Sequence, residues 1–352
     1  MISISNDDSI NLKGLTFIDL FAGIGGFRLA LNSFGAKCVF TSEWDKYAQE
    51  VYEINFGDKP HGDITSIDEK DIPEHDILCG GFPCQAFSIS GKQRGFEDTR
   101  GTLFFDIIRI ARHHKPKILF LENVSNFEKH DNGNTLKTIL SALDEINYDV
   151  YYQVLNASDF GIPHKRERIF FVCFRKDLEI KNFQFTKNVN KPVKLLDITL
   201  PDEVIKEYII NREDIEYHNV KVDIDIFGNY PQKPIRVGTV NKGGQGERIY
   251  HECGHAITLS AYGGGVGAKT GLYLINGKVR KLAPRECARL LGLPDSFKIA
   301  QNKNQAYKQF GNGVVVDVLQ YILIDVNKRL SWTGQSWVQR PQKAVLEMKK
   351  IL

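Results

Sequence analysis

One of the six cysteines lies in surroundings that differ from those of the other five. Cys84 belongs to the segment Gly-Gly-Phe-Pro-Cys-Gln-Ala-Phe-Ser, residues 80–88, which directly follows an apolar run. Open α/β sheets keep their active sites at the carboxyl edge, where such a loop would emerge. An ordinary thiol is mostly protonated at neutral pH, so a positive group or a helix N-terminus has to activate it. We expect Cys84 to be a nucleophile, and Cys38, Cys79 and Cys173 to be small buried side chains.

An acid and two arginines could complete the chemistry of that thiol. Glu122 follows four apolar residues, whose surroundings favour the protonated form of a carboxyl. Arg166 and Arg168 are alternate residues of a predicted strand, so both guanidinium groups could reach one site and hold a carbonyl oxygen or stabilise a thiolate. These residue types match what methylation of cytosine at carbon 5 requires. A thiolate adds to carbon 6 of the ring, and an acid has to neutralise the resulting negative charge before carbon 5 can accept a methyl group. A surface acid and a salt-bridged basic turn are the alternative interpretations.

A glycine turn near the start of the chain is typical of a ligand site. Residues 17–27 place a strand, a glycine turn and a helix start in succession, so that a ligand could lie against backbone N–H groups. Glu43 ends the next strand, where an acid can accept hydrogen bonds from ribose hydroxyls, and Asp63 could bind an adenine amino group. The glycines lack dinucleotide spacing and the turn has no Arg or Lys for a phosphate, which favours S-adenosylmethionine. The alternative is a tight turn with solvated carboxylates.

The elements that must position these residues form an α/β pattern. Strand-like runs alternate with helical patterns over the first 175 residues, which predicts a parallel sheet with helices on both faces. The predicted strands are Leu15–Leu20, Lys37–Ser42, Asp76–Cys79, Lys117–Leu121 and Arg168–Phe174. Two sets of residues have helical spacing and should cover the core with their side chains, aromatics included: Trp44, Tyr47, Ala48 and Val51, and Leu136, Ile139, Leu140 and Leu143.

The pattern changes in the second half of the chain. Ten of the thirty glycines lie between Gly238 and Gly271, which suits loops that approach a ligand closely. We predict a catalytic and cofactor-binding domain over residues 1–200 and a smaller, glycine-rich, mainly β domain over 201–283. Residues 284–352 should form a hinge and return to the first domain.

Composition narrows the function classes without choosing among them. The net charge of +3 permits a polyanionic partner but does not require one. The cysteines form no CxxC pair, so neither a metal site nor a disulfide framework is indicated. The N-terminal sequence does not resemble a secretory signal, and no apolar run has the roughly 20 residues of a membrane span. These observations predict a protein of the reducing cytoplasm.

The order FxGxG, GFPCQ, ENV, RER and a late GN element resembles the bacterial 5-cytosine DNA methyltransferases over nearly the whole chain. The resemblance implies a Rossmann-like, S-adenosylmethionine-dependent fold with Cys84 as nucleophile, Glu122 as acid, and Arg166 and Arg168 as the paired arginines. Gly313 is a departure, because many members have Ser or Ala there. The resemblance implies that nine residues bind the methyl donor: Phe21, Gly23, Gly25, Glu43, Trp44, Asp63, Ile64, Pro83 and Asn312.

The resemblance also implies double-stranded DNA as the partner. The target cytosine must leave the helix at a cost of a few kcal/mol, and Gln245, in the loop 243–248, would fill the gap. Arg248 could read a guanine, and Tyr262 and Ser90 would contact the DNA. The implied DNA sequence is GCGC. The resemblance also implies a monomer, and a cognate restriction endonuclease that cleaves the same DNA site but need not bind this protein.

Rival interpretations can be separated by sequence features. Without the resemblance, the loop 243–248 would be an ordinary mobile loop. An RNA cytosine methyltransferase would share the chemistry, but the target segment here is long and glycine-rich. A DNA-binding protein without catalysis is disfavoured by Cys84 and Glu122, and an oxidoreductase by the glycine spacing.

Overall fold

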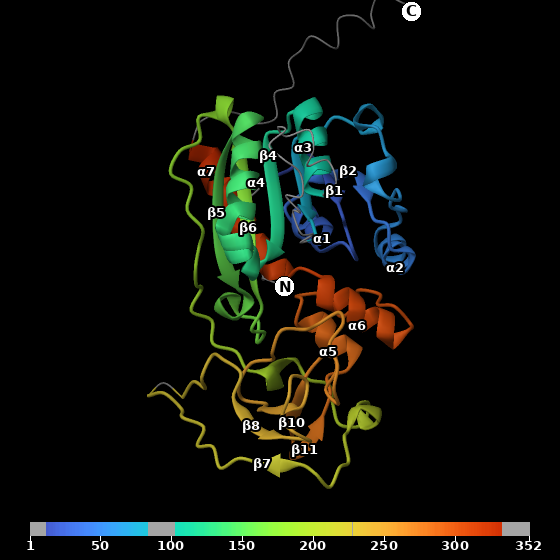
Figure 1. Cartoon of the computed structure of the whole chain (residues 1–352), viewed down its shortest axis with the longest axis vertical. Coiled ribbons are helices and arrows are strands. Elements are labelled where there is room, and N and C mark those ends of the chain that lie inside the picture. Colours follow the sequence, from blue (N-terminus) through green and yellow to red (C-terminus); the bar gives the residue numbers. More distant parts are fainter. Residues whose placement is uncertain (1–11, 84–102, 227, 333–352) are drawn as a thin grey trace, which may run out of the picture.

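The computed structural model describes residues 12–83, 103–226 and 228–332. Cys84 and Ser90 therefore lie outside the described residues. Figure 1 shows two regions, one built on a large sheet with helices on both faces and one built on a smaller sheet. No helix in the described part combines the length and apolarity needed to cross a membrane.

The large sheet is mixed rather than fully parallel. Its order is β2-β1-β3-β4-β6-β5, and β6 is antiparallel to both of its neighbours. The predicted parallel sheet is confirmed for β2, β1, β3 and β4, but the reversed direction of β6 and the strand β5 were not predicted. The physical reason is the connection 157–166 between β5 and β6, because a parallel pair needs a crossover of a dozen or more residues. The strands are β1 Thr16–Leu20, β2 Lys37–Ser42, β3 Ile77–Gly81, β4 Ile118–Val124, β5 Tyr148–Asn156 and β6 Glu167–Arg175.

Helices cover both faces of this sheet, and each face has its own core. Successive strand residues point to opposite faces, so Phe120 packs in one cluster and Leu119 and Leu121 in the other. Helices α1 and α7 contribute to the first cluster, and α3 and α4 to the second. The helices of this region are α1 Gly26–Ser33, α2 Lys46–Phe56, α3 Leu103–His114, α4 Asn134–Glu145 and α7 Val316–Trp332.

The start of α2 corrects a prediction about two aromatic side chains. Ala48 and Val51 are buried as expected, but Trp44 is 76% exposed and Tyr47 is 51% exposed. The side chain of Asp45 accepts a hydrogen bond from the Tyr47 backbone N–H and begins the helix one residue after itself. Trp44 therefore lies in the connection before the helix, not on its core-facing stripe.

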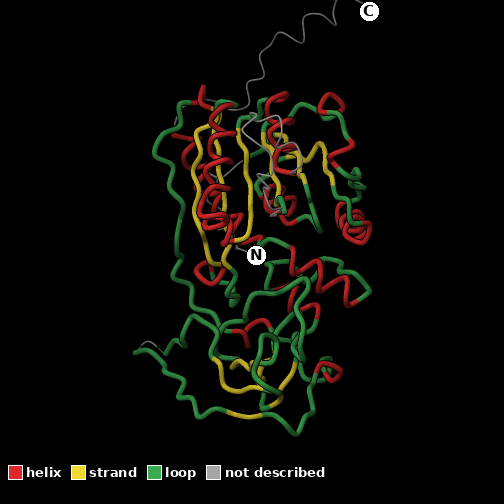
Figure 2. Tube along the Cα trace, in the orientation of Figure 1, coloured by secondary structure: helices red, strands yellow, loops and turns green. Residues whose placement is uncertain are grey.

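The second region is mainly loops around a small sheet, as the predominance of loop in its part of Figure 2 shows. The sheet order is β11-β10-β9-β8-β7, and its core of five buried residues is much smaller than that of the large sheet. Its strands are β7 Glu216–Tyr217, β8 Arg236–Thr239, β9 Arg248–His251, β10 Leu272–Ile275 and β11 Lys278–Arg280. Helices α5 Pro284–Arg289 and α6 Lys303–Asn312 lead back to α7, which packs against α1. The domain boundaries at 200 and 283 remain predictions.

A buried ion pair lies where the chain passes between the regions. Arg280 donates to both carboxylate oxygens of Glu286 at 2.8 and 2.7 Å, and both side chains are almost fully buried. The same carboxylate accepts hydrogen bonds from the backbone N–H of Leu200 at 2.8 Å and of Ala283 at 2.7 Å. One carboxylate therefore binds both segments that connect the regions.

Candidate functional site

A cavity of about 680 Å³ opens at the carboxyl ends of β1 to β4. Its wall combines the first glycine turn with the ends of β2, β3 and β4 and with residues from α6 onward. Of the predicted site residues, the wall includes Phe21, Gly23, Glu43, Trp44, Asp63, Ile64, Pro83, Glu122, Arg168, Tyr262 and Asn312. Residues far apart in the sequence thus meet in a single site.

The glycine turn after β1 bends through the left-handed backbone region. Phe21, Gly23 and Gly25 have φ angles of 56°, 55° and 89°. A side chain rarely adopts this conformation, so the backbone at Phe21 carries strain of about 1–3 kcal/mol at the cavity wall. A Cβ at Gly23 would meet nothing within 4 Å, whereas one at Gly25 would lie 2.3 Å from the Phe56 ring. Gly23 leaves room for a ligand, and Gly25 shapes the turn without lining the cavity.

Two acids follow this turn along the cavity. Glu43 is buried and accepts hydrogen bonds from the backbone N–H of Gly23 at 2.7 Å and of Asp45 at 2.8 Å. Burial raises the pKa of Glu43, and these two hydrogen bonds act in the opposite direction. Asp63 accepts from the backbone N–H of Thr65 at 3.0 Å. Both carboxylates are held in fixed orientations and keep lone pairs for ligand hydroxyl or amino groups.

The segment around α6 closes the other side of the cavity. Lys308 forms an ion pair with Asp45 at 2.7 Å, and the side chain of Gln309 donates to the Tyr47 carbonyl at 2.9 Å. Asn312, at the end of α6, lines the same cavity. The first turn of α2 is therefore attached to the C-terminal part of the chain.

Glu122 forms an ion pair at the end of β4. Arg168, on β6, places Nε 3.0 Å from Oε1 of Glu122. Burial raises the pKa of Glu122, as the apolar run predicted, while Arg168 and Arg166 act to lower it. Gly81 pairs with Glu122 across the sheet, and a Cβ there would lie only 3.0 Å from the carboxylate. The acid is desolvated and has its orientation fixed by one arginine.

Arg166 lies outside the ion pair of Glu122 and Arg168 and binds main-chain carbonyls. Its Nη2 donates to the carbonyls of Gly311 at 2.9 Å and Gly313 at 2.5 Å, and its Nη1 to that of Leu259 at 3.4 Å. The side chain is 2% exposed, and among the described residues Arg168 lines the cavity while Arg166 does not. The prediction that both guanidinium groups would reach one site was therefore wrong for the cavity. The guanidinium of Arg166 instead binds main-chain carbonyls behind the cavity wall.

Comparison with known proteins decides the family. The family model described as C-5 cytosine-specific DNA methylase matches residues 15–328. The chain belongs to this family. The methylase is 60% identical to the type II methyltransferase M.HhaI of Haemophilus parahaemolyticus, over 91% of this chain and 97% of that protein. It is 45% identical to the type II methyltransferase M.HpaII of Haemophilus parainfluenzae, over 87% of each chain. Members of this family take their methyl group from S-adenosylmethionine.

Solved structures support the fold of the methylase. The crystal structure of Dnmt2 methyltransferase from S. pombe aligns with a TM-score of 0.66 and 20% identity, over 89% of this chain and 98% of that one. The crystal structure of a putative DNA modification methyltransferase encoded within an E. coli prophage aligns with a TM-score of 0.66 and 23% identity, over 90% of this chain and 99% of that one. These likenesses show that the fold is shared.

The loop 243–248 of the methylase is held by hydrogen bonds. The carboxylate of Glu247 accepts from the Gly244 backbone N–H at 2.9 Å and from the Asn241 side chain at 2.8 Å. Gln245, between them, is exposed, and Arg248 donates to the Gly243 carbonyl at 3.3 Å. These hydrogen bonds connect the two ends of the loop.

Several residues of the site were missed in the sequence. Asp45, Lys308 and Gln309 join two walls of the cavity, and the Asn123 side chain donates to the Phe82 carbonyl at 3.0 Å in the segment before Cys84. Asp45 has a readable signal, an Asp immediately before a helical pattern. The other contacts join distant segments and leave no local signal. Within the described ranges, no group of three or more His, Cys, Asp or Glu could hold a metal ion.

Proposed function

We propose that the methylase modifies carbon 5 of a cytosine that has swung out of duplex DNA, and that it does so as a type II modification enzyme. The observation that carries this proposal is one cavity lined by both Glu43 and the Glu122–Arg168 pair. It offers a place for the methyl donor beside a place for the base. Pro83, the chain neighbour of Cys84, also lines that cavity.

The residues present fit the methyl donor. The turn at Gly23 leaves open space where a Cβ would stand, and fixed acids at Glu43 and Asp63 follow it. Glu43 would accept from the ribose hydroxyls, and Asp63 and Ile64 would face the adenine. Trp44, 76% exposed at the rim, offers an aromatic face for it. S-adenosylmethionine, when bound, supplies an electrophilic methyl group.

The chemistry assigns distinct tasks to three side chains. The Cys84 thiolate forms a bond to carbon 6 of cytosine, and the electron pair displaced from the ring double bond is stabilised by a proton at ring nitrogen 3. Glu122, whose pKa burial raises, holds that proton. Arg168 orients Glu122 and lies beside the cytosine carbonyl oxygen. After carbon 5 is methylated, its proton leaves and the Cys84 sulfur is expelled, which restores the ring.

The smaller region would read the DNA. Gln245, exposed in a loop with fixed ends, would occupy the gap left by the cytosine, and Arg248 would form paired hydrogen bonds with a guanine. Tyr262 and Ser90 would contact the DNA near the extruded base. Likeness to the HhaI enzyme supports GCGC as the site. We further propose a monomer of the bacterial cytoplasm, accompanied by a restriction endonuclease for the same site.

Two experiments test this function. The purified protein and donor are first incubated with plasmid DNA and the methylated cytosines are mapped, with modification of a cytosine within GCGC as the expected result. A duplex with 5-fluorocytosine at the target should then yield a covalent adduct at Cys84, because the proton whose loss releases the enzyme has been replaced. Methylation of RNA alone, or no adduct at Cys84, would contradict the proposal.

A further inference from the structure

Arg166 is a buried cation whose bonding partners are main-chain carbonyls. Within the described chain it forms no salt bridge, and its two terminal nitrogens donate to Leu259, Gly311 and Gly313. Removing a charged group from water costs several kcal/mol unless other groups replace its hydration. Three carbonyl oxygens serve that purpose for the two terminal nitrogens, while the buried Nε has no partner among the described residues, so the positions of the carbonyls and of the guanidinium depend on one another.

These carbonyls belong to two segments that both reach the cavity. Gly311 and Gly313 flank Asn312, which lines the proposed donor site. Leu259 lies three residues before Tyr262, which lines the same cavity and is 81% exposed. Arg166 therefore joins the donor-facing turn to a segment that faces DNA.

The two segments are also in direct backbone contact. A Cβ at Gly311 would lie 2.2 Å from the backbone nitrogen of Ala261, a distance that real atoms do not tolerate. No residue larger than glycine fits there unless the segments separate. The contact and the Arg166 hydrogen bonds together fix the distance between the turn at Asn312 and the segment that carries Tyr262.

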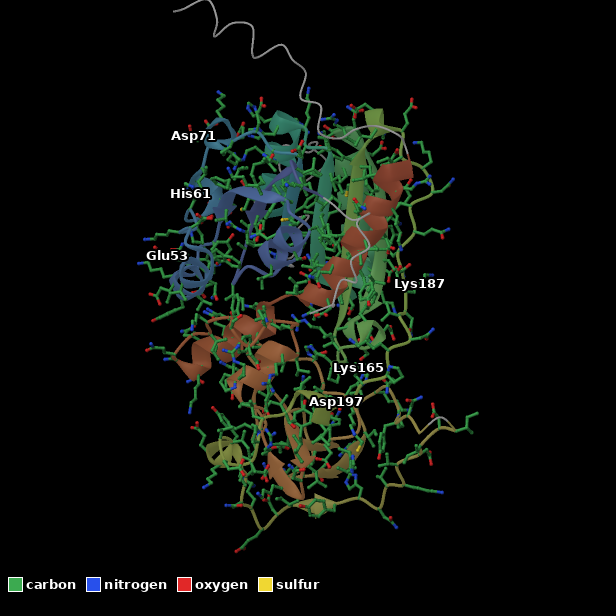
Figure 3. All side chains as sticks on the ribbon, turned by 180° about the vertical axis from the view of Figure 1, so that it is seen from behind. Glu53, His61, Asp71, Lys165, Lys187 and Asp197 are labelled. Atoms are coloured by element: carbon green, nitrogen blue, oxygen red, sulfur yellow. The ribbon has the colours of Figure 1, made fainter. Side chains whose placement is uncertain are left out.

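The segment at Leu259 is held at both its N–H and its carbonyl. His164 accepts a hydrogen bond from the Leu259 N–H at 3.3 Å, and Arg166 donates to the Leu259 carbonyl. The backbone of Arg166 is itself fixed, because its N–H donates to the Asn156 side chain at 3.0 Å. Figure 3 shows Lys165, the preceding residue, at the junction of the two regions.

From this arrangement we infer that Arg166 is a positioning residue that couples the methyl-donor site to the DNA-facing segment, and that it does not bind the cytosine. The inference rests on the proposed function. A donor that binds the turn at Asn312 favours one placement of that turn, and Arg166 transmits the preference to Tyr262. Because coupling between two ligands is reciprocal, DNA should tighten donor binding by the same factor as the donor tightens DNA binding.

The test measures the affinity for S-adenosylhomocysteine, the demethylated donor, by titration calorimetry in the absence of DNA. Arg166→Lys keeps the charge but replaces the planar fork, whose two terminal nitrogens reach separate segments, by one compact ammonium group, and Arg166→Met removes the charge. We expect both to weaken this affinity by roughly tenfold, the effect of one lost charge-assisted hydrogen bond. Titrations repeated with a GCGC duplex should show that the coupling factor falls toward one. A role confined to the cytosine would leave donor binding without DNA unchanged.

Two further variants keep the inference falsifiable if Arg166→Met does not fold. Gly311→Ala leaves Arg166 intact but forces the segments apart, and it should reproduce the loss of donor affinity and coupling. Arg175→Met is the matched control, an arginine at the other end of β6 that pairs with Asp177 at 2.7 Å, and it should bind as the wild type does. Wild-type donor affinity in both Arg166→Lys and Gly311→Ala would overturn the inference.

The outcomes also separate this inference from the proposed function. A wild-type protein that methylates no DNA, but whose donor affinity depends on Arg166, would contradict the function and leave the placement of Arg166 standing. A wild-type protein that methylates GCGC, with variants slowed only in single-turnover methyl transfer, would support the function. That second result would show that Arg166 acts on the cytosine and not on donor binding, and it would overturn the inference.

Discussion

The two regions hold their functional side chains in opposite ways. Glu122, at a strand end in the large region, is 8% exposed and forms a short ion pair. Tyr262, in a glycine-rich segment of the smaller region, is 81% exposed, and the loop around Gln245 is tied by hydrogen bonds instead of a core. Bond-making chemistry benefits from desolvated groups whose charge the surroundings set. Contact with a long polyanion needs exposed groups on segments that can adapt.

The substitution that should separate catalysis from binding most completely is Cys84→Ser. We expect it to abolish methyl transfer, because a serine hydroxyl has a far higher pKa and cannot add to the ring at neutral pH. Binding of DNA and of S-adenosylhomocysteine, measured by titration, should remain within about twofold. Cys38→Ser is the control and should retain turnover. Residual methylation by the Cys84→Ser protein would remove the nucleophile from the account.

The next largest effect is expected for Glu122→Gln. An amide cannot deliver a proton, so addition to the ring should slow by roughly 100- to 10,000-fold, the usual contribution of a general acid. Wild-type single-turnover rates should also fall as pH rises above the raised pKa of Glu122, where the carboxyl loses its proton. Glu145→Gln, an exposed change at the end of α4, serves as control. A near-normal rate for Glu122→Gln would show that the buried acid is not part of the chemistry.

For the smaller region, Gln245→Gly should affect DNA and leave the chemistry intact. We expect about tenfold weaker binding of a GCGC duplex, because the side chain no longer fills the gap beside the extruded cytosine. Single-turnover rates at saturating DNA should change little. The comparison duplex carries an abasic site opposite the target, so that no base pair opposes extrusion of the cytosine and no partner base lines the gap. An equal loss of affinity for both duplexes would place Gln245 outside the gap.

The smallest effect concerns the stability of the large region at acidic pH. Burial lowers the pKa of His75 to about 4, from 6.5 for an exposed histidine, with His114 lowering it further and Asp76 raising it. The unfolded chain then binds a proton that the folded chain does not, so stability is lost as pH falls below about 6.5. Between about pH 7.5 and pH 5 the free energy of unfolding should fall by about 2 kcal/mol from this residue.

Urea unfolding of wild type and His75→Phe at both pH values measures that contribution. Phenylalanine cannot take up the proton, so the variant should show a smaller loss of stability on acidification, whatever its stability at neutral pH. The control is His113→Phe, which replaces an exposed histidine next to His114 in the sequence. Equal pH dependence in wild type and His75→Phe would show that other groups cause the acid sensitivity.

The sequence predicted the large region better than the small one. Apolar runs of four to six residues marked five strands, because burial on both faces requires them. It did not reveal β5, most of whose residues are only partly buried at the sheet edge, nor the reversed direction of β6. Strand direction depends on the length of a connection and on which strands pair, and neither is a local property of the chain.

The same limit applied to the site. Glu43 and Glu122 were predicted from their positions after apolar strands and Asp63 from the order of acids that follow the glycine turn, and all three line one cavity. Alternation along β6 could not show that Arg166 would meet carbonyls more than ninety residues away in the chain. Trp44 was assigned to the core by its spacing, although the cap at Asp45 starts the helix too late to include it. Contacts between distant segments decide such cases.

The ion pair between Arg280 and Glu286 bears on how new specificities could be assembled from this scaffold. Anyone grafting the recognition module of a relative onto this catalytic body would have to choose two splice points, and a cut between residues 280 and 286 gives the partners different origins. If the relative's sequence lacks the arginine, the hybrid protein contains a buried carboxylate without a counter-ion, which costs about 3–5 kcal/mol of stability. Modules transplanted together with the stretch through α5 carry their own counter-ion and avoid that penalty.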